Sequence, residues 1–462
     1  MIKKSVISAH GHDIIAVPDR QSPRRRAGAM RRGGTTTEAR AASLRRAAAR
    51  PSSLLPLSAP VVAFLVVDRS WPVVGAVAML ALGVLTVCGP AGVLAVIPVS
   101  LLAGLSGATS VTLGAIAAVT MVVAVQLVAG TRTPRPAHLW IALLGLLVLL
   151  AYVLPAGGPG TAPDRFSDLI GLLAGLGLLA AVVASPPPAG LMARVAALAG
   201  AVVAGWVLAA GQREGGRLVG FAQNPNFLGA LLALPFVAAA GLALRHRRPA
   251  WLVPAGVCVA AMAATQSRGA FVSAAAGVAV VLLQGRRRGI QVAIVATAAV
   301  LGTVFPAAID TVEHVAVGDR PAAELSQDSS VREHVAWYAA KVAAEHPLRG
   351  IGYGVFPSYA ENSPHLGIYI ATHNDYLRLA AETGIPALIV FLVLIWLGMK
   401  SPASGEAAVQ RAMVAAYAVG MLFANPLANL VVSTPFWLAL GCLLAAPASR
   451  EHPINSALGV KT

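Results

Sequence analysis

Residues 136–154 read PAHLWIALLGLLVLLAYVL, and this stretch decides the fold class. It contains no Asp, Glu, Lys or Arg. Its length is close to the roughly 20 apolar residues that a helix needs to cross the hydrocarbon core of a bilayer. Similar apolar runs recur from about residue 53 to residue 447 and leave no room for a separate globular core. The sequence therefore predicts one all-α, polytopic membrane domain over residues 51–448.

Proline, glycine and polar residues divide the apolar runs into candidate spans of helical length. We predict about 12–14 transmembrane helices. The candidate spans are centred near residues 60, 79, 98, 119, 147, 177, 201, 235, 257, 277, 299, 392, 419 and 440.

The composition supports the membrane class and argues against nucleic-acid binding. The chain is 57% hydrophobic and 12% charged, whereas about 25% of the residues of a soluble domain are charged. The net charge is +16, but twelve of the 35 Lys and Arg residues lie in residues 1–50, which contain no aromatic residue. We expect this segment to be a disordered cytoplasmic tail attracted to anionic lipid; a start at Met30 is an alternative. Residues 449–462 are expected to form a second cytoplasmic tail.

The distribution of basic residues in the short loops predicts the orientation of the chain. When the basic tail is placed inside and the spans alternate, most Lys and Arg residues fall on the inner side, as expected for cytoplasmic loops. Both termini are then cytoplasmic, and residues 309–383 form one long extracytoplasmic loop. This loop holds ten of the 19 acidic residues and five of the ten histidines. Loops of this length are usually functional or disordered.

Helix signals within the loop argue against disorder beyond about residue 328. Ser330 to Glu333 fits a capping box, which predicts a helix start there. Val335, Tyr338 and Val342 fall on one face of that helix. The pattern predicts a short amphipathic helix that lies on or near the membrane surface.

A second helix start is predicted at Thr372–Asp375. Gly384 is expected to end this helix, and Pro386 to open the next span. His373 and Asn374 would then occupy the first turn. A helix N-terminus disfavours imidazolium, so His373 would stay neutral and act as a general base. The alternative is that His373 is only a polar residue in a surface loop.

Three arginines fall on the same side of the membrane as His373. Arg217 and Arg268 lie in short outward turns, and Arg332 lies on the amphipathic helix. Guanidinium groups match phosphate oxygens in a bidentate way, so these residues suit a lipid-linked phosphate or diphosphate. The alternatives are that Arg268 snorkels to lipid headgroups and that Arg332 is a solvated surface charge.

The cysteines predict neither a disulfide nor a metal site. Cys88, Cys258 and Cys442 lie in separate apolar runs, without a CxxC or a Cys/His spacing.

Four stretches, in this order, resemble the family of O-antigen ligases and Wzy-type polymerases. They are RLVGFAQNPNFLG (217–229), TQSRGAF (265–271), SSVREHVAWYAAKVAAEHPLRGIGYGVF (329–356) and THNDYLRLAAETGIPAL (372–388). The resemblance covers about residues 210 to 400. It implies a GT-C-like, all-helical glycosyltransferase of the plasma membrane that needs no metal or other cofactor. The implied substrates are an undecaprenyl-diphosphate glycan and a glycan or lipid acceptor, for cell-surface polysaccharide assembly.

The resemblance also implies roles for individual residues. His373, with Asn374 beside it, looks like the histidine thought to activate the acceptor hydroxyl. Arg217 and Arg268 look like the diphosphate-binding arginines. Arg332 and Trp337 match the R…W element of the family, and we place Arg332 with the diphosphate-binding residues and Trp337 with the supporting ones.

Two further features bear on these roles. Ala387 stands where the ligase pattern has Gly, Thr or Tyr, so ligase and polymerase both stay open. Pro347 and the glycines that follow it are expected to shape the loop rather than to react.

Two alternative functions belong to other classes of protein. A secondary transporter or flippase of lipid-linked glycans would show ionisable residues within its spans and two matching halves. A structural scaffold would tolerate changes at the arginines and the histidine.

Overall fold

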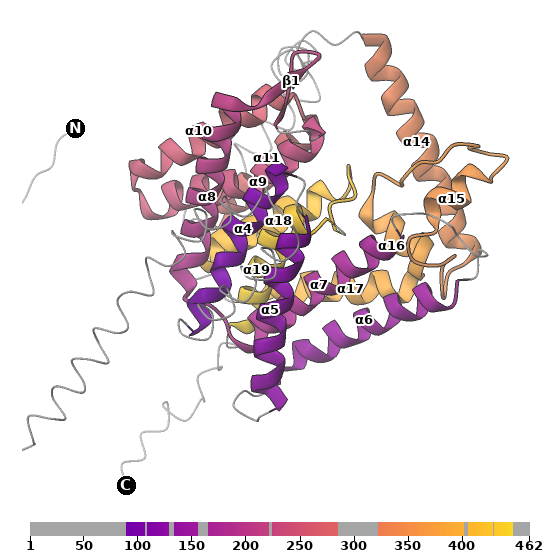
Figure 1. Ribbon diagram of the computed structural model, residues 1–462, viewed down its shortest axis with the longest axis horizontal. Coiled ribbons are helices and arrows are strands. Elements are labelled where there is room, and N and C mark those ends of the chain that lie inside the picture. The colour runs from indigo at the N-terminus through magenta and orange to yellow at the C-terminus, as the bar shows by residue number, and fades with distance from the viewer. Residues whose placement is uncertain are drawn as a thin grey trace, which may run out of the picture. The chain divides into compact units, whose positions relative to one another are not determined.

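Helices make up most of the chain that the structure describes (Figure 1). The computed structural model describes residues 89–106, 109–128, 134–155, 165–220, 224–284, 322–401, 405–427 and 429–446. Its helices are η2 (Gly89–Ala95), α4 (Val96–Ser106), α5 (Thr109–Val128), α6 (Pro136–Val153), α7 (Arg165–Ala184), α8 (Ala189–Ala210), α9 (Pro225–His246), η3 (Pro249–Trp251), α10 (Leu252–Thr265), α11 (Arg268–Leu283), α14 (Ala322–Glu345), α15 (Phe356–Glu361), α16 (Asp375–Thr383), α17 (Ile385–Lys400), α18 (Ala407–Gly420) and α19 (Leu430–Ala445).

The helices confirm the prediction of an all-α polytopic membrane protein. Each predicted span centre that falls on described residues lies within a helix. By length and composition, four of these helices, α6 to α9, can cross a membrane, and shorter apolar helices accompany them. The spans predicted near residues 60, 79 and 299 lie outside the described residues, as do Cys88 and both predicted tails. The likeness to the GT-C fold stays a prediction.

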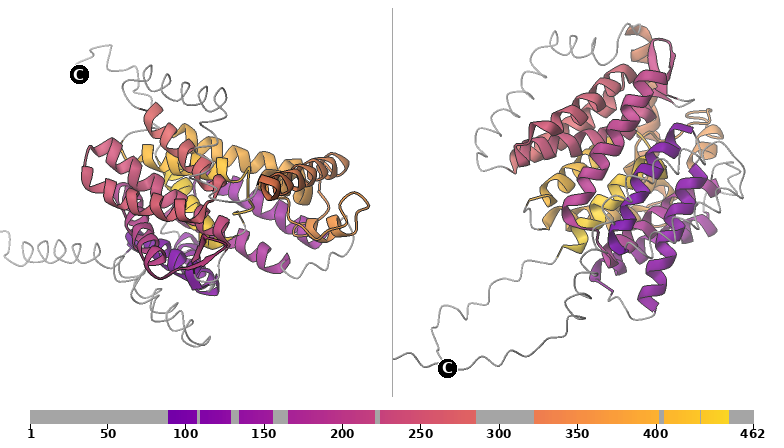
Figure 2. Two further views of the ribbon diagram at one scale, coloured as in Figure 1. Left: turned by 90° about the horizontal axis from the view of Figure 1, so that it is seen from above. Right: turned by 60° about the vertical axis from the view of Figure 1, so that its left-hand side comes forward.

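The helices pack closely because small residues face large ones. α9 packs against α8, α10, α11 and α18, and α19 packs against α7 and α4; Figure 2 shows the helices of residues 189–283 side by side. At Gly200 of α8, an added Cβ would lie 2.0 Å from Cβ of Pro235 in α9. At Gly175 of α7, it would lie 2.3 Å from Nε1 of Trp437 in α19. Close backbone approach at small residues is the usual way that membrane helices associate.

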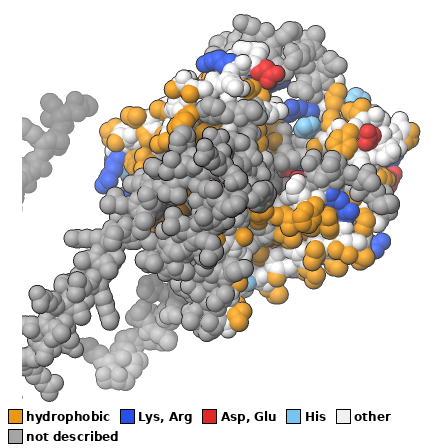
Figure 3. Space-filling model, in the orientation of Figure 1, with side chains coloured by type: hydrophobic (Ala, Val, Ile, Leu, Met, Phe, Trp, Pro, Cys, Tyr) orange, Lys and Arg blue, Asp and Glu red, His pale blue; other side chains and the backbone are white. Residues whose placement is uncertain are grey.

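One face of α6 is apolar but exposed. Ile141, Leu144 and Val148 are buried, whereas Leu139 is 74% and Leu146 is 52% exposed. Hydrophobic side chains cover the lower right of the space-filling view, where α6 lies (Figure 3). An exposed apolar stripe of this kind suits contact with lipid.

A small hairpin is an exception to the all-helical prediction. β1 (Gln212–Glu214) pairs antiparallel with β2 (Arg217–Gly220) between α8 and α9. The turn consists of Gly215 and Gly216, whose φ angles are 54° and 78°. Glycine pairs favour this conformation, because both central residues of a tight hairpin turn can require a positive φ.

The first loop helix differs from its prediction at its start and in its environment. α14 already includes Ala322, so Ser330 lies inside the helix and the expected capping box is wrong. The carbonyl oxygen of Ser330 lies 2.8 Å from Nδ1 of the His334 ring, one helical turn later. The predicted apolar face exists, but Val335, Tyr338 and Val342 pack into a second core with residues of α15 and α16. The amphipathic face is therefore buried within the protein.

Candidate functional site

A cavity of about 660 Å³ lies among α9, α11, α14, α18 and α19. Its wall includes Arg268, Arg332 and His373, which come from three segments far apart in the sequence. Apolar side chains of the bundle helices line another part of it, among them Ala230, Ala233, Leu234, Val272 and Val432. The cavity thus combines basic groups with an apolar wall. Figure 3 shows arginine or lysine side chains next to histidine on the face that it draws.

His373 lies just outside the helix in which the sequence placed it. Asn374 is the N-cap of α16, and its side-chain oxygen accepts hydrogen bonds from the backbone N–H groups of Tyr376 and Leu377, both at 3.0 Å. His373 precedes the cap and has a left-handed φ of 52°. The prediction that His373 and Asn374 occupy the first turn is therefore wrong, because the cap uses Asn374 and the chain turns sharply before it. Gly384 ends α16 and Pro386 opens α17, as predicted.

Hydrogen bonds hold the segment around His373 against residues 421–427. The N–H of Asp375 donates to the carbonyl of Met421 at 2.9 Å, and the N–H of Leu427 donates to the Asp375 carboxyl group at 2.7 Å. The Asn374 amide donates to the carbonyl of Leu422 at 3.3 Å. These contacts fix the position of His373 relative to the turn between α18 and α19.

Arg268 occupies the tight turn that the sequence predicted. α10 ends at Thr265, Gln266 takes a left-handed φ of 54°, and Ser267 is the N-cap of α11. Arg268 is thus the first residue of α11, and its side chain lines the cavity.

The other predicted site residues lie at different distances from the cavity. Arg332 lines it, and its Nη1 lies 3.5 Å from the carbonyl oxygen of Phe423. Arg217 lies beside it in β2 and donates to the carbonyl of Thr265 and to Oδ1 of Asn226, both at 3.0 Å. Trp337 is 59% exposed and packs edge-on against the ring of His365. The structure therefore brings Arg268, Arg332 and His373 together, with Arg217 adjacent and Trp337 elsewhere on α14.

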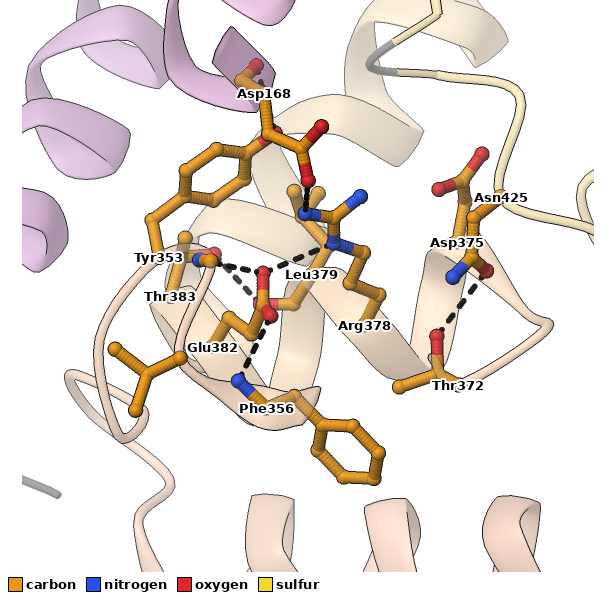
Figure 4. A network of polar contacts seen from close by, with 12 residues as sticks. Asp168, Tyr353, Phe356, Thr372, Asp375, Arg378, Leu379, Glu382, Thr383 and Asn425 are labelled. Atoms are coloured by element: carbon orange, nitrogen blue, oxygen red, sulfur yellow. Dashed lines mark hydrogen bonds and ion pairs between the residues drawn. The ribbon is translucent and has the colours of Figure 1, made fainter. Parts of the chain in front are cut away.

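A partly buried ionic cluster around Arg378 was missed by the sequence analysis (Figure 4). Arg378 of α16 forms ion pairs with Asp168 of α7 and with Glu382 one turn later. Glu382 also accepts hydrogen bonds from the backbone N–H groups of Gly354 at 2.9 Å and Phe356 at 3.1 Å. The spacing of Arg378 and Glu382 was the available signal, because residues four apart meet on a helix.

The glycines of this loop adopt conformations that side chains rarely take. Gly350, Gly352 and Gly354 have φ angles of 61°, 121° and 73°. An added Cβ at Gly350 would lie 2.3 Å from the backbone of Glu382. These residues shape the loop that delivers its N–H groups to Glu382.

Replacing Arg378 by methionine should destabilise the protein by about 3–5 kcal/mol, because the change leaves Glu382 buried without its cation. The expected result is a large fall in the unfolding temperature of the detergent-solubilised protein. Arg349→Met is the control, since Arg349 is exposed in the same loop. Equal unfolding temperatures in the two variants would contradict a stabilising role of the cluster.

Asp375 should make stability depend on pH. Burial raises the pKa of its carboxyl group from 3.8 to about 8, although Arg378 and the N–H of Leu427 act in the opposite direction. Between these pH values the folded state keeps a proton that the unfolded state has lost, so the free energy of unfolding falls as pH rises. Asp375→Asn cannot titrate but retains an acceptor for Leu427. We expect the unfolding temperature of this variant to change less than that of the wild type between about pH 5 and 8.

Glu361→Gln serves as the control for this measurement, because Glu361 is an exposed carboxylate at the end of α15. Its pH profile should follow the wild type. Identical slopes for the wild type and Asp375→Asn would show that Asp375 does not titrate in this way.

The helical fold defines a membrane protein, and its cavity has both basic and apolar side chains in the wall. Residues 253–392 match the family model described as O-Antigen ligase. The matched region contains Arg268, Arg332, Trp337, His373 and Asn374, and begins after Arg217. The match confirms the resemblance predicted from the sequence and supports membership of the O-antigen ligase family. No curated protein matches the chain.

The family match and the fold together support a function at a general level. The chain is a multi-pass membrane protein with a glycan-handling function of the O-antigen ligase or polymerase kind. The match implies a lipid-linked glycan and an acceptor as substrates at this general level.

Proposed function

We propose that the protein transfers a glycan from a polyprenyl-diphosphate carrier to an acceptor hydroxyl. The observation that supports this best is that Arg268, Arg332 and His373 line one cavity that also has an apolar wall. A donor lipid requires both features, because its diphosphate is anionic and its isoprenoid chain is apolar.

The arginines would hold the diphosphate and stabilise the charge that develops as it leaves. Guanidinium groups bind phosphate oxygens through paired hydrogen bonds. Arg268 and Arg332 are in position to do so from the cavity wall. Arg217 donates a hydrogen bond to Asn226, which is itself part of the wall. Positive groups placed in advance at a departing anion lower the barrier electrostatically. This charge would come from side chains, so we propose transfer without a metal ion.

His373 would act as the general base. The acceptor hydroxyl attacks the anomeric carbon, the bond from that carbon to the diphosphate oxygen breaks with its electron pair, and the hydroxyl proton passes to the imidazole. Direct displacement of this kind inverts the configuration at the carbon. The hydrogen bonds that clamp residues 372–375 to residues 421–427 would hold the imidazole at the cavity.

The apolar wall would hold the first isoprene units of the carrier. Ala230, Ala233, Leu234, Val272 and Val432 line the cavity between bundle helices. The small side chains of Ala230 and Ala233 leave room for a branched hydrocarbon. The proposed setting is the outer face of the plasma membrane, with both termini in the cytoplasm.

The test is product analysis with the purified protein in liposomes. With a defined polyprenyl-diphosphate oligosaccharide and a candidate acceptor, we expect the glycan to move to a new linkage and polyprenyl diphosphate to be released, also in the presence of EDTA. Lengthened chains on the carrier would identify a polymerase, and glycan on another acceptor a ligase. Movement of the glycan across the bilayer without a new linkage would replace the proposal by a transporter or flippase.

A further inference from the structure

Three helices begin at the cavity. The N-cap residues of α9, α11 and α19 are Asn224, Ser267 and Asn429, and all three line its wall. The first N–H groups of a helix have no partner within the helix, and the helix dipole is positive at this end. Three such ends around one cavity favour an anion in addition to the arginines.

Four asparagines line the same cavity: Asn224, Asn226, Asn425 and Asn429. In each, the side-chain oxygen is next to a donor from the protein. Asn224 accepts from the N–H of Asn226 at 2.9 Å, Asn226 from Arg217 at 3.0 Å, Asn429 from the N–H of Val431 at 3.2 Å, and Asn425 lies 3.1 Å from the hydroxyl of Thr372. For the first three, the donor is an N–H group, which identifies the oxygen end of the amide.

This arrangement leaves the amide nitrogens for a ligand. Asn224, Asn226 and Asn429 have no hydrogen-bond partner at these nitrogens within the part of the chain that the structure describes. The Asn425 nitrogen is buried and is also without a partner there. Asn374 differs, since its nitrogen donates to the carbonyl of Leu422.

The charge of the wall agrees with this pattern. Among the described residues that line the cavity, Arg268 and Arg332 are cationic and none is acidic. The charged side chains of the wall are therefore donors only. A ligand that satisfies several donors at once needs many acceptor oxygens close together, and a diphosphate has more of them than a monophosphate.

We propose that Asn224 and Asn429 are specificity-determining residues, whose side-chain N–H groups bind the oxygens of a lipid diphosphate and favour it over a lipid monophosphate. This inference rests on the proposed function, because it takes the donor to be a diphosphate lipid. It adds to the arginines a set of neutral donors at the N-termini of two bundle helices.

The experiment uses Asn224→Asp and Asn429→Asp in the full-length, detergent-solubilised protein. Aspartate is as good an N-cap as asparagine and suits the positive helix end, so the unfolding temperature should stay the same or rise. The ligand, however, would meet a carboxylate oxygen in place of an N–H donor. Binding is measured with farnesyl diphosphate, farnesyl monophosphate and inorganic diphosphate.

We expect each variant to bind farnesyl diphosphate about tenfold or more weakly, since a hydrogen bond to a charged group contributes at least that much to affinity. Binding of the monophosphate should weaken less, so the ratio of the two affinities should fall. If the site recognises a lipid diphosphate and not free diphosphate, the wild type should bind inorganic diphosphate more weakly than farnesyl diphosphate. Asn362→Asp is the matched control, because Asn362 donates to the carbonyl of Ser358 away from the cavity.

An unchanged affinity ratio in both variants, with the unfolding temperature kept, would overturn the inference. Inorganic diphosphate that binds the wild type as tightly as farnesyl diphosphate would overturn the lipid part. The binding measurement needs no turnover, so it separates the two proposals. A wild type that binds the diphosphate through these asparagines but makes no new glycan linkage would refute the proposed function and leave this inference standing.

Discussion

Replacing His373 by asparagine should lower kcat for glycan transfer about 10²- to 10⁴-fold, which is the usual contribution of a general base. Asparagine is the most informative replacement, because His373 has a left-handed φ of 52° and asparagine tolerates this conformation. The backbone and its clamp to residues 421–427 should therefore persist. Alanine would remove the base as well, but it would add backbone strain.

Donor binding should change little in His373→Asn, since the diphosphate is assigned to other residues. The measurement is the initial rate at saturating donor, together with the affinity for farnesyl diphosphate. His346→Asn, in the same loop but outside the cavity wall, is the control. A rate close to that of the wild type in His373→Asn would remove the general base from the mechanism.

Replacing Arg268 by methionine should lower kcat for transfer about 10²- to 10³-fold, by analogy with the loss of one donor from an oxyanion site. Methionine has a similar length and no charge. Arg268 begins α11 at the cavity wall, so the loss falls directly on the proposed diphosphate. Arg268→Lys should recover part of the rate, because lysine keeps the charge but lacks the planar pair of donors.

Arg349→Met is again the control, as an exposed arginine of the loop. The affinity for farnesyl diphosphate should fall in Arg268→Met and should be close to normal in His373→Asn. This contrast distinguishes a residue that binds the donor, Arg268, from one that acts as the general base, His373. If Arg268→Met transfers glycan at the wild-type rate, Arg268 does not hold the leaving group, and the alternative of a snorkelling arginine returns.

Local patterns were sufficient to predict the helices. The apolar runs located every described bundle helix, because the length of a span follows from the thickness of a bilayer, although the centre predicted near residue 419 lies close to the C-terminal end of α18. Gly384 and Pro386 correctly marked the end of α16 and the start of α17. The start of α14 was misplaced, because a capping pattern at Ser330 also fits the interior of a longer helix. His373 was placed inside the first turn of α16, although it directly precedes the N-cap Asn374, for a similar reason, since Thr372, Asn374 and Asp375 are all acceptable caps.

The sequence by itself determined that this is a helical membrane protein with a polar loop rich in acids and histidines, and that Arg268 and His373 are candidates for one site. Only the tertiary structure decided which residues share the cavity. It placed Arg332 in the wall, left Arg217 beside it, and put Trp337 elsewhere. It also revealed the Asp168–Arg378 ion pair, whose partners are far apart in sequence. Periodicity and caps depend on neighbours within a few residues, whereas a site depends on contacts between distant segments, and such contacts leave no periodic trace in a single sequence.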